Sequence, residues 1–71
     1  MALSPERITA GARLRFRCSP HRVHHPALRH KEYDGQIVTV IYPDLYGGAL
    51  VVVEAEDGWR GAVVDCELHE P

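Results

Sequence analysis

The sequence predicts a single small all-β domain of five short strands. Residues 12–17 alternate between apolar and basic side chains, which is the pattern of a half-buried strand. Residues 36–42 and 49–56 are rich in β-branched side chains, which favour strands. The Asp-Gly pair at 57–58 is typical of a tight hairpin turn, and no segment after the first 11 residues has helical periodicity.

The chain is expected to open with a short helical arm at residues 1–11. Ser4 can cap a helix, Pro5 suits its first position, and Gly11 is expected to end it within about two turns. The first strand follows directly. Its alternation places the apolar side chains toward a core and the basic ones on the opposite face.

The remaining strands are separated by recognisable turn residues. The second strand covers residues 36–42, and Pro43 is expected to stop it because proline lacks an N–H for the ladder. The third covers 49–56, and the hairpin loop after it is two residues long, or three if Glu56 belongs to it. The fourth strand covers 59–65, and Leu68 lies in a short fifth strand.

Residues 18–35 form a long first loop with no periodicity, rich in basic residues and histidine. A loop of this length is unusual in a compact domain and is often functional. All 71 residues are expected to fold as one domain. A chain of this size buries only about 60% of its unfolded surface, so it has too little core to divide between two domains.

The layout of strand, long loop and four further strands joined by short turns resembles an SH3-like barrel. The phrases at 10–14 (Ala-Gly-Ala-Arg-Leu), 34–38 (Asp-Gly-Gln-Ile-Val) and 56–59 (Glu-Asp-Gly-Trp) are similar to the strand openings of KOW- and Tudor-like barrels. The resemblance covers about residues 10–70. It implies a barrel, but many unrelated functions share this fold.

The segment at 35–38 also resembles the second strand of the plasmid-borne type II dihydrofolate reductases, which are short SH3-like chains. Their active site is built from a Val-Gln-Ile-Tyr segment in a later strand, whereas residues 60–64 here are Arg-Gly-Ala-Val-Val. No nucleophile elbow, phosphate loop or zinc-protease motif is present in the sequence. We therefore expect a protein that is not an enzyme.

The net charge of −2 hides an asymmetry between the two halves of the chain. Residues 1–31 carry seven of the eight basic side chains and one acid, giving +6, whereas residues 32–71 carry one base and nine acids, giving −8. One interpretation is a face that binds nucleic acid, using the basic side chains of Arg13, Arg15, Arg17, Arg22, Arg29 and Lys31. The other is that the basic first strand pairs with acidic strands beside it.

Two Cys-x-x-His pairs have the spacing of metal ligands. Cys18 with His21, and Cys66 with His69, lie at the end of the first strand and the start of the last. These strands are neighbours in an SH3-like barrel, and two cysteines with two histidines are a common ligand set for structural zinc. The sequence thus allows a zinc ion as the one candidate cofactor; the alternative is surface histidines and free thiols.

The second and third strands are apolar on both faces, which exceeds what the interior of one small barrel needs. The surplus must be covered by the chain's own arm and loop or by another protein. As protein-binding candidates we take Ile41 and Val51, both expected to point outward, together with the aromatic side chains of Tyr42, Tyr46 and Trp59.

The sequence therefore predicts a non-catalytic interaction module that binds a protein partner or self-associates as a homo-oligomer. The alternative is a nucleic-acid-binding barrel that uses the arginine stripe at 13, 15 and 17. No apolar run reaches the roughly 20 residues that span a bilayer, and no signal peptide is evident at the start. We therefore expect a cytoplasmic protein with no membrane partner.

Overall fold

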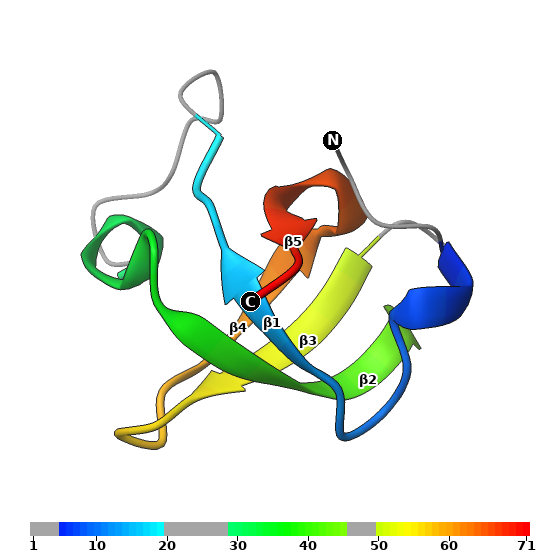
Figure 1. Cartoon of the computed structure of the whole chain (residues 1–71). Helices are drawn as coiled ribbons and strands as arrows, with labels where there is room; N and C mark the ends of the chain where they lie inside the picture. The colour runs from blue at the N-terminus through cyan, green and yellow to red at the C-terminus, as the bar shows by residue number, and fades with distance from the viewer. Residues whose placement is uncertain (1–4, 20–28, 46–49) are drawn as a thin grey trace.

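Five antiparallel strands form one sheet in the order β4-β3-β2-β1-β5 in a computed structural model of the chain (Figure 1). The structure describes residues 5–19, 29–45 and 50–71. Within these residues, three single turns of 3-10 helix accompany the strands. In chain order the elements are η1 (Pro5–Arg7), β1 (Arg13–Phe16), η2 (His30–Tyr33), β2 (Ile37–Leu45), β3 (Leu50–Ala55), β4 (Arg60–Val64), η3 (Asp65–Glu67) and β5 (Leu68–His69).

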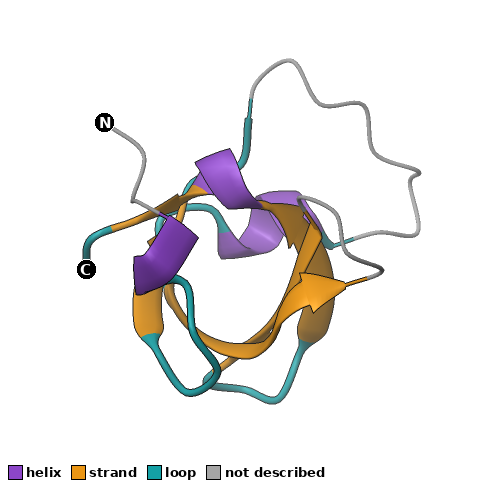
Figure 2. Ribbon diagram, turned by 90° about the vertical axis from the view of Figure 1, so that its right-hand side faces the viewer, coloured by secondary structure: helices purple, strands orange, loops and turns teal. Residues whose placement is uncertain are grey.

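The sheet curls strongly into a half-barrel, so the first and last strands of the chain become neighbours (Figure 2). Strand β1 pairs on one side with β2, where Leu14 lies opposite Val38, and on the other with β5, where Phe16 lies opposite Leu68. The predicted fold class, a small all-β domain of five strands, is confirmed.

The core consists of the inward-facing side chains of all five strands, together with one residue from the arm and one from η2. The alternation in β1 is as predicted: Leu14 and Phe16 are buried while Arg13 is exposed. The arm contributes Ile8 and η2 contributes Tyr33. The buried apolar residues are Ile8, Leu14, Phe16, Tyr33, Val38, Val40, Val51, Val53, Ala55, Val63 and Leu68.

The hairpin between β3 and β4 has the longer of the two predicted loops. The Ala55 N–H donates to the Trp59 carbonyl at 2.8 Å, and the Gly58 N–H donates to the Ala55 carbonyl at 3.0 Å. Glu56 therefore belongs to the loop. Gly58 has a φ of 96°, a left-handed conformation that glycine adopts without a steric penalty.

Strand β2 continues through Pro43 to Leu45, so the expectation that this proline stops the strand was wrong. The register between β2 and β3 shifts between Val40 and Tyr42 and again between Tyr42 and Leu45. Such bulges accommodate proline inside a strand.

The N-terminal arm and the first loop both differ from prediction. The arm has one 3-10 turn with Pro5 first, not two turns of helix, and Ser4 lies outside the described residues. The first loop, expected to be irregular over 18–35, includes the 3-10 turn η2. None of the helical turns in the described ranges is long and apolar enough to cross a membrane.

Candidate functional site

The outward-facing side of β2, β3 and β4 carries an apolar surface. Pairing sets the side chains in rows across the strands: Tyr42 lies opposite Val52, and Val52 lies opposite Ala62. In the next row Leu50 lies opposite Val64. We call this set the outer face: Tyr42, Leu50, Val52, Ala62 and Val64.

Two side chains make the outer face a candidate binding surface. Tyr42 is 59% exposed and Leu50 is 37% exposed, and they are the large apolar side chains that are exposed among the described residues. Val52, Ala62 and Val64 are half-buried between them. Adjoining exposed apolar side chains on one face are typical of protein-binding surfaces.

A bulge in β2 turns Tyr42 outward. Val40 pairs with Val53 and Tyr42 pairs with Val52, so two steps along β2 match one step along β3. Strict alternation from the buried Val40 would place Tyr42 inside the barrel. The extra residue, Ile41, changes the phase, and bulges often re-aim a side chain in this way.

The protein-binding candidates from the sequence therefore divide. Val51 is only 1% exposed, so the expectation that it points outward was wrong; its neighbour Val52 holds that position. Ile41 is half-buried at the bulge, and Tyr46 lies outside the described residues. Tyr42 is exposed as a binding residue requires.

One charged row borders the outer face, and its charges are already paired. The Arg60 Nε donates to the Glu54 carboxylate at 2.6 Å, and these residues lie opposite each other on β4 and β3. The carboxylate raises the pKa of the Arg60 guanidinium, through the hydrogen bond first and then through charge. Beyond this pair, Arg13 on β1 donates to Glu56 in the hairpin loop at 2.9 Å.

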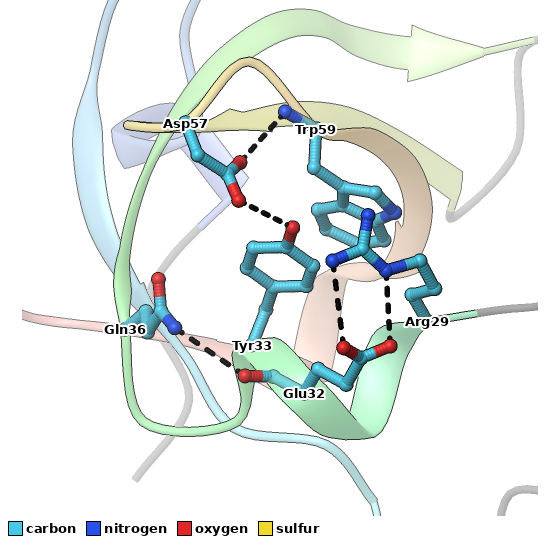
Figure 3. Close-up of polar contacts among 6 residues, drawn as sticks. All are labelled: Arg29, Glu32, Tyr33, Gln36, Asp57 and Trp59. Atoms are coloured by element: carbon cyan, nitrogen blue, oxygen red, sulfur yellow. Dashed lines mark hydrogen bonds and ion pairs between the residues drawn. The ribbon is translucent and has the colours of Figure 1, made fainter.

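Trp59, the remaining protein-binding candidate, belongs to a second cluster, in which it lies against Tyr33 of η2 (Figure 3). Its indole is stacked on Tyr33, with ring centroids 4.3 Å apart and planes inclined by 10°. The His30 ring meets the indole edge-on at 5.1 Å. We call Trp59, Tyr33, His30 and Asp57 the latch, because they join η2 to the β3–β4 hairpin.

Asp57 holds the latch together through its two carboxylate oxygens (Figure 3). It accepts the Tyr33 hydroxyl at 2.6 Å and the Trp59 backbone N–H at 2.9 Å. The Tyr33 hydrogen bond, aided by that of Trp59, holds the pKa of Asp57 below its ordinary value. The same hydrogen bond and burial raise the pKa of Tyr33.

The exposed guanidinium of Arg29 lies over the Tyr33 ring of the latch. The Arg29 guanidinium is 5.5 Å from the centroid of the Tyr33 ring and donates to both oxygens of Glu32, at 3.0 and 3.4 Å (Figure 3). This pair is exposed, so it contributes little to stability. The Gln36 side-chain amide donates to the Glu32 carbonyl at 3.3 Å.

Gly61 makes room for the indole. A Cβ at Gly61 would lie 2.4 and 2.5 Å from two carbons of the Trp59 ring and 3.2 Å from Nε2 of His30. No side chain fits there while the stack is in place. The latch is therefore a packed structural unit. Its one signal in the sequence is the glycine two residues after the tryptophan, which leaves room for the indole.

The outer edge of β4, the side away from β3, receives contacts from two side chains of the described residues. Because Trp59 bonds to β3, the alternation of an antiparallel ladder turns the backbone groups of Ala62 and Val64 toward the edge. The His30 Nε2 donates to the Ala62 carbonyl at 2.8 Å, and the Val64 N–H donates to Glu67 at 2.9 Å. These contacts oppose the addition of a further strand at this edge.

The buried Glu67 also fixes the start of the long loop. It is 2% exposed, and its second carboxylate oxygen accepts the Ser19 N–H at 2.8 Å. One residue earlier, the Cys18 N–H donates to the Asp34 carboxylate at 2.9 Å. The N–H groups of Ser19 and Val64 thus hydrogen-bond the buried Glu67 carboxylate, which offsets the free-energy cost of removing it from water.

Three of the six candidate nucleic-acid residues, Arg13, Arg15 and Arg29, are engaged within the chain. Arg13 pairs with Glu56, and Arg15 donates to the Gly35 carbonyl at 2.6 Å. Arg17 and Lys31 are exposed, while Arg22 lies outside the described residues. Besides the local pair Arg29–Glu32, the ion pairs Arg13–Glu56 and Arg7–Glu70 of the described residues join the basic half of the sequence to the acidic half. The alternative interpretation, in which the first strand pairs with acidic strands beside it, was wrong in detail: the partners of Arg13 and Arg15 on the neighbouring strands are Thr39, Ile37 and His69, and the acid that binds Arg13 comes from the hairpin loop.

The zinc candidates are brought together only in part. Strands β1 and β5 are neighbours, as the zinc hypothesis requires, and neither Cys18 nor Cys66 is in a disulfide bond. His69 is half-buried in β5, whereas His21 lies outside the described residues. Within the described ranges no three metal-ligating side chains gather. The four-ligand site therefore stays a prediction.

Comparison with models of known families, with characterised proteins and with solved structures finds no match for this chain.

Proposed function

We propose that this chain is a non-catalytic interaction module that binds a protein through the outer face. The observation that carries the proposal is the bulge at Ile41, which turns Tyr42 out of the barrel and leaves it 59% exposed. An aromatic ring is costly to leave in water, and aromatic residues are enriched where proteins bind one another.

Other features of the described residues favour this surface over the alternatives. The latch is filled by its own side chains, and the edge of β4 is partly closed by His30 and Glu67. The arginine stripe is partly paired with acids of the same chain. The exposed free thiol of Cys66 is typical of a reducing compartment, which supports a cytoplasmic site of action as part of the proposal.

The proposal is tested by photo-crosslinking in the cells that produce the protein. A photoreactive phenylalanine analogue in place of Tyr42 is expected to give adducts of defined mass. The same analogue in place of Glu70, exposed beyond the opposite edge strand β5, is the matched control. Adding Val52→Lys to the position-42 variant should suppress the adducts, because it puts a charge at the centre of the outer face.

Adducts that are equal at positions 42 and 70, or that survive Val52→Lys, would contradict the proposal. The mass of the adduct also identifies the occupant of the face.

A further inference from the structure

We infer that the partner on the outer face is a second copy of this chain, related by a two-fold axis that runs along β3. The inference rests on the proposed function and names its partner. Three features of the outer face support it: the order of side-chain sizes across the strands, the position of the charged row, and the neutrality of that row.

The order of sizes makes the face self-complementary. In the row that crosses the three strands, β2 carries the large exposed ring of Tyr42, β3 carries Val52, and β4 carries the small Ala62. A two-fold axis parallel to β3 lays β2 of one copy over β4 of the other. Each Tyr42 ring then covers the Ala62 position of the other copy, and the two Val52 side chains meet at the axis.

The charged row selects this axis over a perpendicular one. An axis across the strands would lay the apolar row of Leu50 and Val64 onto the row of Glu54 and Arg60. Burying a charged pair against apolar side chains has a desolvation penalty, and that arrangement provides no new hydrogen bond or ion pair to offset it. An axis along β3 lays the apolar rows of the two copies over each other and the charged rows over each other, with the strands of the two sheets aligned as in packed sheets.

The charged row does not prevent the approach of a second copy. Glu54 and Arg60 are paired within each chain at 2.6 Å, so each copy brings a neutral row to the border of the interface. The contact is small, because the outward side of a curled sheet is convex and the set has five side chains. A weak, reversible dimer follows, in the range of small interfaces.

The test exchanges the large and small side chains by mutation. Tyr42→Ala leaves alanine over alanine and Ala62→Tyr sets tyrosine against tyrosine, so each variant should weaken the dimer by about fivefold or more. The double variant Tyr42→Ala/Ala62→Tyr again has tyrosine over alanine and should recover the association. Within one chain, positions 42 and 62 are separated by Val52 and lie two strand spacings, about 10 Å, apart. Because the two side chains do not touch within one chain, recovery in the double variant reports contact between copies.

The measurement is sedimentation velocity of the full chain at concentrations up to about 1 mM. Circular dichroism and thermal unfolding of every variant confirm that each is folded, and Val52→Lys serves as a second, independent disruption of the face. Concentration-dependent dimerisation that both single variants weaken and the double variant restores supports the inference.

Three outcomes overturn it. A wild-type chain that stays monomeric throughout excludes the second copy. A dimer indifferent to Tyr42→Ala, Ala62→Tyr and Val52→Lys uses another surface. Single variants that weaken a dimer without recovery in the double variant exclude this axis. If the wild type is monomeric but crosslinks from position 42 to a different protein, the inference fails while the proposed function stands.

Discussion

At the scale of single residues, the hydrogen bond between Tyr33 and Asp57 couples the latch to pH. The Tyr33 pKa is raised, so the stability that this group contributes is fully present below the ordinary tyrosine pKa of about 10 and is lost as pH rises through the folded value. The Asp57 pKa is lowered, so its contribution is present above about 3.9 and is lost as pH falls through the folded value.

We predict that one of the three tyrosines titrates at higher pH than the others, and that Tyr33→Phe removes this late step. Absorbance at alkaline pH measures the titration directly. The same substitution should also weaken the acid-side loss of stability, because it frees Asp57 of its main hydrogen bond. Three tyrosines titrating together would show that the hydroxyl is not held by Asp57.

Gly61 gives the second prediction at this scale. Gly61→Ala forces a methyl group into the Trp59 ring, so the indole must leave its stack on Tyr33. Overpacking of this kind costs about 1–3 kcal/mol. Near-ultraviolet circular dichroism and urea unfolding report the two effects. In a Trp59→Phe background the cost should shrink, and an unchanged cost there would place the strain elsewhere.

At the scale of elements, the β3–β4 hairpin depends on the left-handed Gly58. Gly58→Ala meets no neighbouring atom within 4 Å, so its cost is conformational, about 1–3 kcal/mol in the free energy of unfolding. Gly58→Asn should cost less, because asparagine tolerates positive φ better than alanine. Equal costs for the two variants, measured by urea unfolding, would contradict this explanation.

The sequence was sufficient to predict the strands and the hairpin, since both depend on local patterns. The alternation of Leu14 and Phe16 and the Asp-Gly pair at 57–58 each specify structure through neighbours along the chain. The extension of β2 past Pro43 was not predictable, because it depends on bulges that form only against β3.

The same limit explains the candidate site. A bulge shifts the phase of all later side chains, so period-two reasoning could not establish that Tyr42 points out. Val51 was misplaced for a related reason: in a run of Leu-Val-Val-Val, either phase fits the sequence. The sequence left the hairpin loop at two or three residues, and only the three-residue loop aligns Val52 with Ala62 and Leu50 with Val64.

At the scale of the whole molecule, folding brings the basic and acidic halves of the chain together. The pairs Arg7–Glu70 and Arg13–Glu56 join the two halves, and the net charge is −2. A polyanion is attracted by an unbalanced positive surface, and pairing of this kind reduces that imbalance.

We therefore predict no retardation of mixed DNA or RNA by this protein in mobility shifts, even at low salt. A salt-dependent shift that is lost in an Arg13→Gln/Arg17→Gln variant would contradict the prediction and revive the nucleic-acid hypothesis. The variant Arg7→Gln, which changes charge away from the stripe, is the control for a general charge effect.

The anchoring of the long loop has a consequence for engineering. Glu67 and Asp34 hold the backbone at residues 18–19, and His30 holds the other end against Ala62. With both ends tied to the barrel, the entropic cost of a longer connection rises only slowly with its length. Foreign peptides inserted between Ser19 and Arg29 should leave the barrel folded, which would make this small chain a display scaffold.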